Sequence, residues 1–144
     1  MRSATIAAAA VLAVLSACGS DGSSDDSAPK GSGDSSASAT SLEIVVTPAE
    51  DAKTSTYRLT CDPAGGDHPQ AQQACDALAK AGASVFDAVP KDRACTTIYG
   101  GPQTASVTGT YDGEKVDASF SRADGCEIER WEKLGTTFFN VPLQ

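Results

Sequence analysis

The side chains best suited to chemistry in this sequence are a single histidine, His68, and five cysteines. In hydrolases a histidine acts as a general base beside an activated serine or cysteine. No Gly-x-Ser-x-Gly motif accompanies His68, which lies in a turn-rich stretch directly before Pro69, and the acidic residues are scattered. We therefore interpret His68 as a turn or helix-capping residue, and we do not expect an enzyme.

The cysteines are informative because their number is odd. Setting aside Cys18, which belongs to the N-terminal segment, leaves Cys61, Cys75, Cys95 and Cys126. No Cys-x-x-Cys pair or His-rich cluster is present, so we expect neither a metal site nor a cofactor. In an exported chain, four such cysteines predict two disulfides, and spacing alone leaves all three pairings open. A bridge between Cys61 and Cys75 would stabilise the fold by about 3 kcal/mol.

The N-terminal segment predicts export. Arg2 precedes an apolar run at residues 4–15, which is shorter than the roughly 20 residues that span a bilayer. Residues 1–17 therefore have the pattern of a signal peptide. The sequence Leu-Ser-Ala-Cys ending at Cys18 resembles the lipobox of bacterial lipoproteins, in which the cysteine is lipidated and becomes the new N-terminus. The alternative is an ordinary signal peptide cut near Ala17, which would leave a secreted chain with a spare thiol.

A polar segment follows at residues 18–41 and is dominated by Gly, Ser, Asp and Ala. Such a composition offers almost nothing to bury and predicts a flexible tether. Behind a lipidated Cys18, it would hold the folded part at the outer face of the cell membrane. That part is then one domain, residues 42–144. The net charge of -8 argues against nucleic acid as a partner.

Alternating apolar residues predict strands at residues 42–47 and 56–61, which should pair as neighbours. The sequence "SVTGTYDGEKVDASFS" predicts a hairpin with a two-residue turn at Asp112-Gly113 and Tyr111 opposite Glu114. A last strand is predicted within "TTFFNVP" at residues 136–142, ending at Pro142.

Two helices complete the predicted fold. The first starts at Pro69, carries an apolar stripe that includes Cys75, and stops near Lys80 and Gly82. The second, "CEIERWEKLG", places Ile128, Trp131 and Leu134 at a spacing of three and ends at Gly135. We expect an α+β fold in which an antiparallel sheet of about five strands carries two helices on one side, with two disulfides.

None of the strands and helices predicted above includes the stretch "RACTTIYGGP" at residues 93–102. Thr, Ile and Tyr favour extended backbone, and Gly-Gly-Pro does not continue a strand. By itself the stretch is compatible with an edge strand that runs into a turn.

Taken in order, these pieces resemble the Streptomyces-type subtilisin inhibitors over about residues 57–139. The matching fragments are Leu59-Thr60-Cys61 before a Gly-rich turn and His68-Pro69, the Ala-rich helix with Cys75, Cys95 three residues before Ile98-Tyr99, Gly109-x-Tyr111-x-Gly113-x-Lys115-Val116, Phe120-Ser121 leading to Cys126-Glu127, and Phe138-Phe139. Each fragment is weak alone, but their order and spacing together are fairly specific.

The resemblance implies disulfides Cys61–Cys75 and Cys95–Cys126, and inhibition of a serine protease with a subtilisin-like or trypsin-like fold. In such inhibitors, the segment after the third cysteine is a reactive loop that enters the protease cleft as a substrate would. Carried onto this sequence, the loop consists of Ala94, Cys95, Thr96, Thr97, Ile98 and Tyr99. The scissile bond would join Thr97 to Ile98, and Thr97 would enter the primary specificity pocket. Relatives commonly dimerise through the sheet, so the resemblance also raises a homodimer.

Three departures from the family pattern bear on the target. Thr97 is small and polar where the family commonly has a large apolar or basic side chain. We therefore expect weak inhibition of subtilisins with deep primary pockets and better inhibition of proteases with shallow ones. Thr96 stands where the family often has proline, and Ala94 is small for an outer apolar pocket. Gly100-Gly101-Pro102 makes the loop one residue longer, which would loosen its far side.

These departures also support a second hypothesis, a tethered envelope module that keeps the fold and binds another partner without inhibiting a protease. Tyr99 and Trp131 are the aromatic residues that would anchor such contacts. Trp131, however, shares helical spacing with Ile128 and Leu134, which favours a place in the core.

Overall fold

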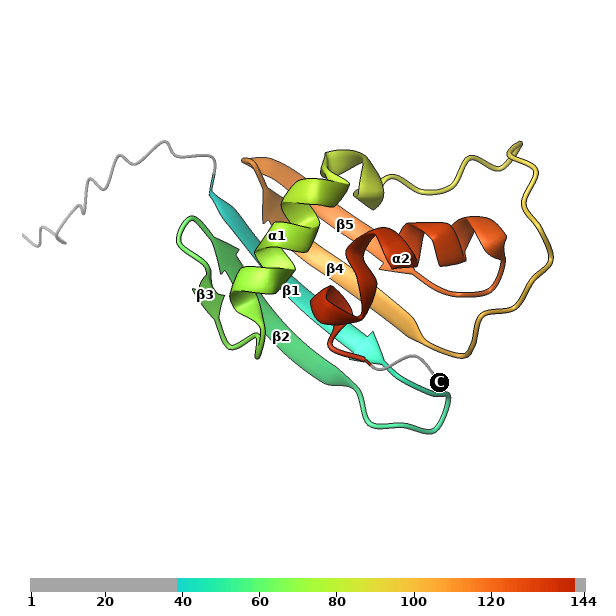
Figure 1. Ribbon diagram of the computed structural model, residues 1–144, viewed down its shortest axis with the longest axis horizontal. Coiled ribbons are helices and arrows are strands. Elements are labelled where there is room, and N and C mark those ends of the chain that lie inside the picture. The colour runs from blue at the N-terminus through green and yellow to red at the C-terminus, as the bar shows by residue number, and fades with distance from the viewer. Residues whose placement is uncertain (1–38, 142–144) are drawn as a thin grey trace, which may run out of the picture. The chain divides into compact units, whose positions relative to one another are not determined.

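In the computed structural model, the described residues, 39–141, form a five-stranded antiparallel sheet with two α-helices on one face (Figure 1). The elements are β1 (Thr40–Thr47), β2 (Ser55–Cys61), β3 (Gly65–Gly66), α1 (Ala71–Ala81), the 3-10 helix η1 (Ala83–Phe86), β4 (Thr104–Tyr111), β5 (Glu114–Phe120) and α2 (Gly125–Phe139). The strands lie in the order β3-β2-β1-β4-β5. The predicted fold class is confirmed.

Alternation in the central strand β1 gives the sheet one buried face. Leu42, Ile44 and Val46 are buried, whereas Ser41 and Glu43 are exposed. Because successive strand residues point to opposite faces, the apolar set lies on the helix side. β1 pairs with β2 on one side, as predicted, and with β4 on the other.

The β4–β5 hairpin has the predicted turn and register. Asp112 and Gly113 have φ angles of 50° and 81°, and a type I′ turn requires positive φ at both positions. Tyr111 pairs with Glu114, so the apolar residues of both strands share the buried face.

Aromatic rings fill the space between the sheet and the helices. The rings of Trp131 and Phe139 stack with their centroids 4.0 Å apart, and Phe120 packs edge-on against Phe139. Trp131 is fully buried, as its spacing predicts. Neither helix in residues 39–141 is long and apolar enough to cross a lipid bilayer.

Arg130 fixes α2 relative to the sheet. Its guanidinium donates hydrogen bonds to the carbonyl oxygens of Val85 (2.9 Å) and Ser119 (3.0 Å). It also pairs with Glu127 at 3.0 Å and lies over the ring of Phe120. These contacts set the position of the N-terminal half of α2, which carries Cys126.

The prediction of a C-terminal strand is wrong, since residues 136–139 form the last turn of α2. Phe138 and Phe139 are both fully buried, whereas adjacent residues of a strand would point to opposite faces. After a kink at Gly135, where φ is 73°, one helical turn places both rings in the core. The fifth strand is instead β3, which pairs with β2.

His68 is a turn residue, as predicted. Its Nδ1 accepts a hydrogen bond from the backbone N–H of Gln70, which leaves Nε2 to donate to the carbonyl oxygen of Phe138 at 3.0 Å. Both ring nitrogens are therefore occupied by the main chain. Helix α1 begins at Ala71, because this turn continues through Gln70, so Pro69 precedes the helix instead of starting it.

The predicted signal peptide at residues 1–17, Cys18 and most of the predicted tether lie outside the described residues. Thr40 and Ser41, the last residues of that predicted tether, are already in β1. Ser41 pairs with Thr60 on one side and with Thr110 on the other. The sheet therefore begins at Thr40 and not at residue 42.

Candidate reactive loop

Residues 94–101 have no regular secondary structure and run around one end of the domain between η1 and β4 (Figure 1). They pair with no strand of the described sheet, so the interpretation as an edge strand is wrong. Other contacts hold this segment, and they lie at its two ends.

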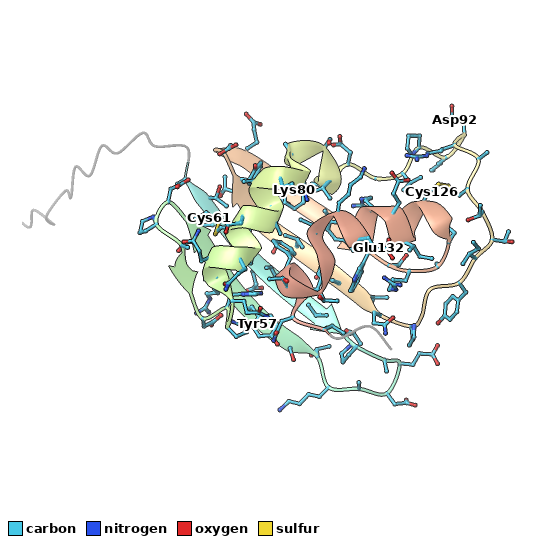
Figure 2. All side chains as sticks on the ribbon, viewed as in Figure 1. Tyr57, Cys61, Lys80, Asp92, Cys126 and Glu132 are labelled. Carbon is cyan, nitrogen blue, oxygen red and sulfur yellow. A yellow bond between two sulfur atoms is a disulfide. The ribbon has the colours of Figure 1, made fainter. Side chains whose placement is uncertain are left out.

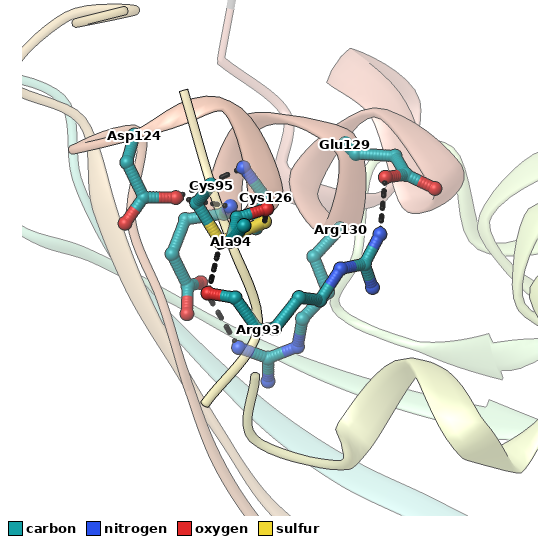
Figure 3. Close-up of a disulfide and its surroundings, with 8 residues drawn as sticks. Arg93, Ala94, Cys95, Asp124, Cys126, Glu129 and Arg130 are labelled. Atoms are coloured by element: carbon teal, nitrogen blue, oxygen red, sulfur yellow. Dashed lines mark hydrogen bonds and ion pairs between the residues drawn. A yellow bond between two sulfur atoms is a disulfide. The ribbon is translucent and has the colours of Figure 1, made fainter. Parts of the chain in front are cut away.

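A disulfide anchors the N-terminal end of this loop. Cys95 is bonded to Cys126 in the first turn of α2, and their Cα atoms lie 5.4 Å apart (Figure 3). The second disulfide, Cys61–Cys75, joins the end of β2 to α1. The structure thus contains both pairings that the family resemblance implies.

Polar groups surround the Cys95–Cys126 bond. The Asp124 carboxylate lies near both sulfur atoms, but sulfurs joined in a disulfide are not thiolate ligands for a metal. Arg93 pairs with Glu129 of α2 at 3.1 Å. Both of these side chains are about half exposed, so the ion pair contributes little to stability.

The N-terminus of α2 holds Thr96. The Asp124 carboxylate caps this helix by accepting hydrogen bonds from the N–H groups of Cys126 (2.9 Å) and Glu127 (3.0 Å). The N–H of Gly125, the first residue of the helix, donates to the carbonyl oxygen of Thr96 at 3.0 Å. A Cβ atom at Gly125 would overlap the hydroxyl oxygen of Thr96, so any larger residue there would displace that side chain.

The far end is also fixed, which corrects the prediction that the Gly-Gly-Pro segment loosens it. The N–H of Gly100 donates to the carbonyl oxygen of Arg122 at 2.8 Å. The Nε of Arg122 donates in turn to the carbonyl oxygen of Gly100, also at 2.8 Å. One residue therefore satisfies both main-chain groups of Gly100.

Between these two ends the chain is exposed. Ala94, Thr96 and Thr97 are exposed, and Cys95 is partly buried. Ile98 and Tyr99 are 63% and 66% exposed and are the large hydrophobic residues of the described chain that stand open to solvent. The structure thus brings all six predicted loop residues into one continuous, accessible segment.

Sequence reasoning missed the residues that support the loop from behind, namely Asp124, Gly125 and Arg122. A local signal existed for Asp124, since an Asp three residues before Glu127 has the pattern of a capping box. Arg122 has no such signal, because its partner Gly100 is distant in sequence.

Known proteins resemble this chain in sequence. The family model described as "Subtilisin inhibitor-like" matches residues 37–123. The chain belongs to the subtilisin inhibitor-like family. Subtilisin inhibitor-like protein 1 of Streptomyces cacaoi is 40% identical over 77 residues, which cover 50% of this chain and 68% of that protein.

A solved structure is also similar to this member of the subtilisin inhibitor-like family. It is the complex of Streptomyces caespitosus sermetstatin with Bacillus licheniformis subtilisin. The inhibitor is 21% identical to this chain, with a TM-score of 0.43, over 70% of this chain and 96% of the other.

Proposed function

We propose that this chain inhibits a serine endopeptidase by presenting the Thr97–Ile98 peptide bond as a substrate would. Membership of the subtilisin inhibitor-like family supports protease inhibition, and the loop geometry supports this particular bond. On this proposal the chain is not itself an enzyme; it binds in the active-site cleft of one.

The observation that carries the proposal is a short exposed segment between two fixed points. Thr96 is fixed by Gly125 and by the neighbouring disulfide, and Gly100 is fixed by Arg122. The intervening residues are exposed. A protease cleft binds an extended chain through its main-chain groups, and alternate side chains fill pockets. Since β-branched Thr97 and Ile98 already restrict their own torsions, little conformational freedom is lost on binding.

The same anchors explain inhibition instead of digestion. The protease serine would attack the carbonyl carbon of Thr97, forming an ester and releasing the amine of Ile98. Held on both sides, this amine would stay close to the ester and re-form the amide faster than water could hydrolyse the ester. The chain would be a very slow substrate.

The side chains of the loop indicate the class of protease. Thr97 would underfill a deep apolar primary pocket, so a protease with a shallow primary pocket is favoured. On the leaving-group side, exposed Ile98 and Tyr99 offer apolar area to the protease. We therefore expect a target that combines a shallow primary pocket with apolar pockets for the two residues after the scissile bond.

The test is to incubate the full chain, carrying Cys18→Ser to prevent lipidation, with serine proteases of subtilisin-like and trypsin-like folds. We expect one-to-one inhibition, strongest for enzymes with shallow primary pockets, and slow cleavage that yields a new N-terminus at Ile98. Absence of inhibition across the panel, or rapid digestion, would contradict the proposal. The alternative of a module without inhibitory activity is not favoured, because both family membership and the fixed loop support inhibition.

We also propose that the chain is exported through its signal peptide and held at the outer face of the membrane by lipid on Cys18. The lipobox-like Leu-Ser-Ala-Cys sequence and the polar segment after it support this proposal. The chain should then partition into detergent with the membrane fraction, whereas the Cys18→Ser variant should not. Equal partitioning of the two proteins would instead favour a secreted, unlipidated inhibitor.

A further inference from the structure

We infer that Arg122 is a positioning residue of the inhibitory loop, which keeps cleavage of the Thr97–Ile98 bond reversible. This inference rests on the proposed function and extends it, because it assigns retention of the leaving amine to one side chain outside the loop.

The contacts of Arg122 are specific to the leaving-group side. Its backbone oxygen accepts from the N–H of Gly100, and its Nε donates to the oxygen of the same residue, both at 2.8 Å. The second bond is charge-assisted and is therefore stronger than a neutral one. Gly100 lies two residues after Ile98, just as Cys95 lies two residues before Thr97. The chain is thus fixed at the same number of residues before and after the proposed scissile bond.

Gly100 is suited to this contact by its lack of a side chain. A Cβ atom there would lie 2.8 Å from two side-chain carbons of Ile128 in α2 and 3.1 Å from Nε of Arg122. Real Cβ atoms essentially never approach as closely as 2.8 Å, and 3.1 Å is also unusually tight, so glycine allows the loop to lie against both residues. Arg122 and Ile128 together form the support for the far end of the loop.

No other main-chain hydrogen bond within residues 39–141 fixes the loop between Gly100 and β4. The next paired residue is Thr104, which lies opposite Thr47 of β1. Without the Arg122 side chain, Gly100 would keep only the hydrogen bond from its N–H to the Arg122 backbone oxygen, and a cut chain would be held more loosely from Ile98 as far as Thr104. A longer free segment lowers the effective concentration of its end near a fixed point.

This difference matters for the reverse reaction. On acylation, the C–N bond between Thr97 and Ile98 breaks, an ester forms to the protease serine, and the nitrogen of Ile98 takes up a proton. In the reverse step the deprotonated amine attacks the ester, the amide forms again, and the serine regains its proton. The rate of this step depends on how closely the amine is held, whereas hydrolysis of the ester by water does not.

The setting of Arg122 indicates that fold stability alone does not explain it. Its side chain is only 9% exposed, and its contact with Glu132 is long, at 4.0 Å. The buried NH1 has no hydrogen-bond partner among the described residues. A buried donor without a partner costs free energy. The guanidinium is buried despite this cost, and its short hydrogen bond is to the loop.

The experiment compares Arg122→Met, which keeps an apolar stem but has no donor, with Arg58→Met, the same change on an exposed strand residue. Each is made in the full chain with Cys18→Ser. A catalytic amount of the best-inhibited protease is added, and the ratio of intact to Thr97–Ile98-cleaved inhibitor is followed to equilibrium by mass spectrometry. We expect Arg122→Met to shift this ratio toward the cleaved form by about tenfold or more, with inhibition fading as it does.

The control variant should behave like the parent protein. An unchanged ratio in Arg122→Met would overturn the inference while leaving the proposed function intact, whereas a parent protein that inhibits no protease would overturn both. Circular dichroism and thermal unfolding show whether Arg122→Met is folded. Should it not fold, the result is taken from Arg122→Lys, which keeps the charge and most of the stem but has no donor at the Nε position.

Discussion

In the proposed mechanism, Thr97 is the side chain that most directly selects the protease. It is exposed at the position that would enter the primary pocket, and it carries few atoms with which to fill one. The support behind it is rigid, since a disulfide and two hydrogen-bonded contacts fix the residues on either side. Changes at Thr97 should therefore alter the fit to the protease without altering the loop.

The variant Thr97→Leu tests this point. An added apolar group in a deep apolar pocket strengthens binding by about 1–3 kcal/mol per methylene. We therefore expect the inhibition constant for a subtilisin with such a pocket to fall by about tenfold or more. Thr108→Leu, at an exposed position of β4, is the matched control and should leave that constant unchanged. If Thr97→Leu has no effect, the reactive bond lies elsewhere.

Only some of the residues of the candidate site can be predicted from the sequence. The proposed scissile bond, Thr97–Ile98, comes from the family resemblance, in which Cys95 and the Ile98-Tyr99 pair keep their spacing. Arg122 could not be found in that way, because its contact with Gly100 exists only once β5 and the loop lie side by side. The same contact explains why the loop is anchored at Gly100, the first residue of the Gly-Gly-Pro segment.

Among the elements, α2 has the most direct connection to function. Its first turn carries Cys126, its N-terminal N–H at Gly125 holds Thr96, and its side chain Ile128 lies against Gly100. The helix is held in turn by the Asp124 cap and by Arg130. Fraying of its first turn should therefore disturb both ends of the loop.

The variant Asp124→Ala tests the link between this helix and the loop. Loss of an N-cap carboxylate should lower the free energy of unfolding by about 1 kcal/mol, measured by chemical denaturation. The capped turn also contains Gly125, whose N–H holds the carbonyl oxygen of Thr96, so inhibition should weaken as well. Asp117→Ala, on an exposed position of β5, serves as the control and should change neither quantity. A fully stable but non-inhibitory Asp124→Ala would show that the carboxylate acts on the protease and not through the helix.

Elements with a clear period were predictable, whereas the short elements β3 and η1 and the last turn of α2 were not. β1 and β2 alternate along their whole length, the hairpin alternates along most of its length, and α1 shows a helical stripe. The last turn of α2 is short and contains Thr and Phe, which favour strands. Its helical form comes from tertiary packing, since only that turn buries Phe138 and Phe139 together.

For the molecule as a whole, the face of the sheet opposite the helices is polar. The side chains on that face are Ser41, Glu43, Val45, Thr47, Thr56, Arg58, Thr60, Thr104, Ser106, Thr108, Thr110, Lys115, Asp117 and Ser119. Val45 is the one apolar residue in this set. The core of a homodimer interface is typically about 65% apolar, so this face is poorly suited to become one.

We therefore expect the Cys18→Ser chain to be a monomer at micromolar concentration, in contrast to the homodimer that the family resemblance raised. Light scattering coupled to size-exclusion chromatography measures the mass directly. A Thr60→Tyr, Thr108→Tyr double variant would be a positive control, because added aromatic area should promote association. A dimeric mass for the parent chain would mean that polar strand residues suffice for pairing.

The Cys95–Cys126 crosslink has a practical consequence for anyone who looks for cleavage at this loop. The cut would fall inside the covalent ring that the crosslink closes, so both pieces would stay joined. A nicked molecule would differ from the original by the elements of one water, and it would migrate as a single band in electrophoresis without a thiol reagent. A sample that looks untouched on such a gel could therefore already be an equilibrium mixture, and only reduction would separate its parts.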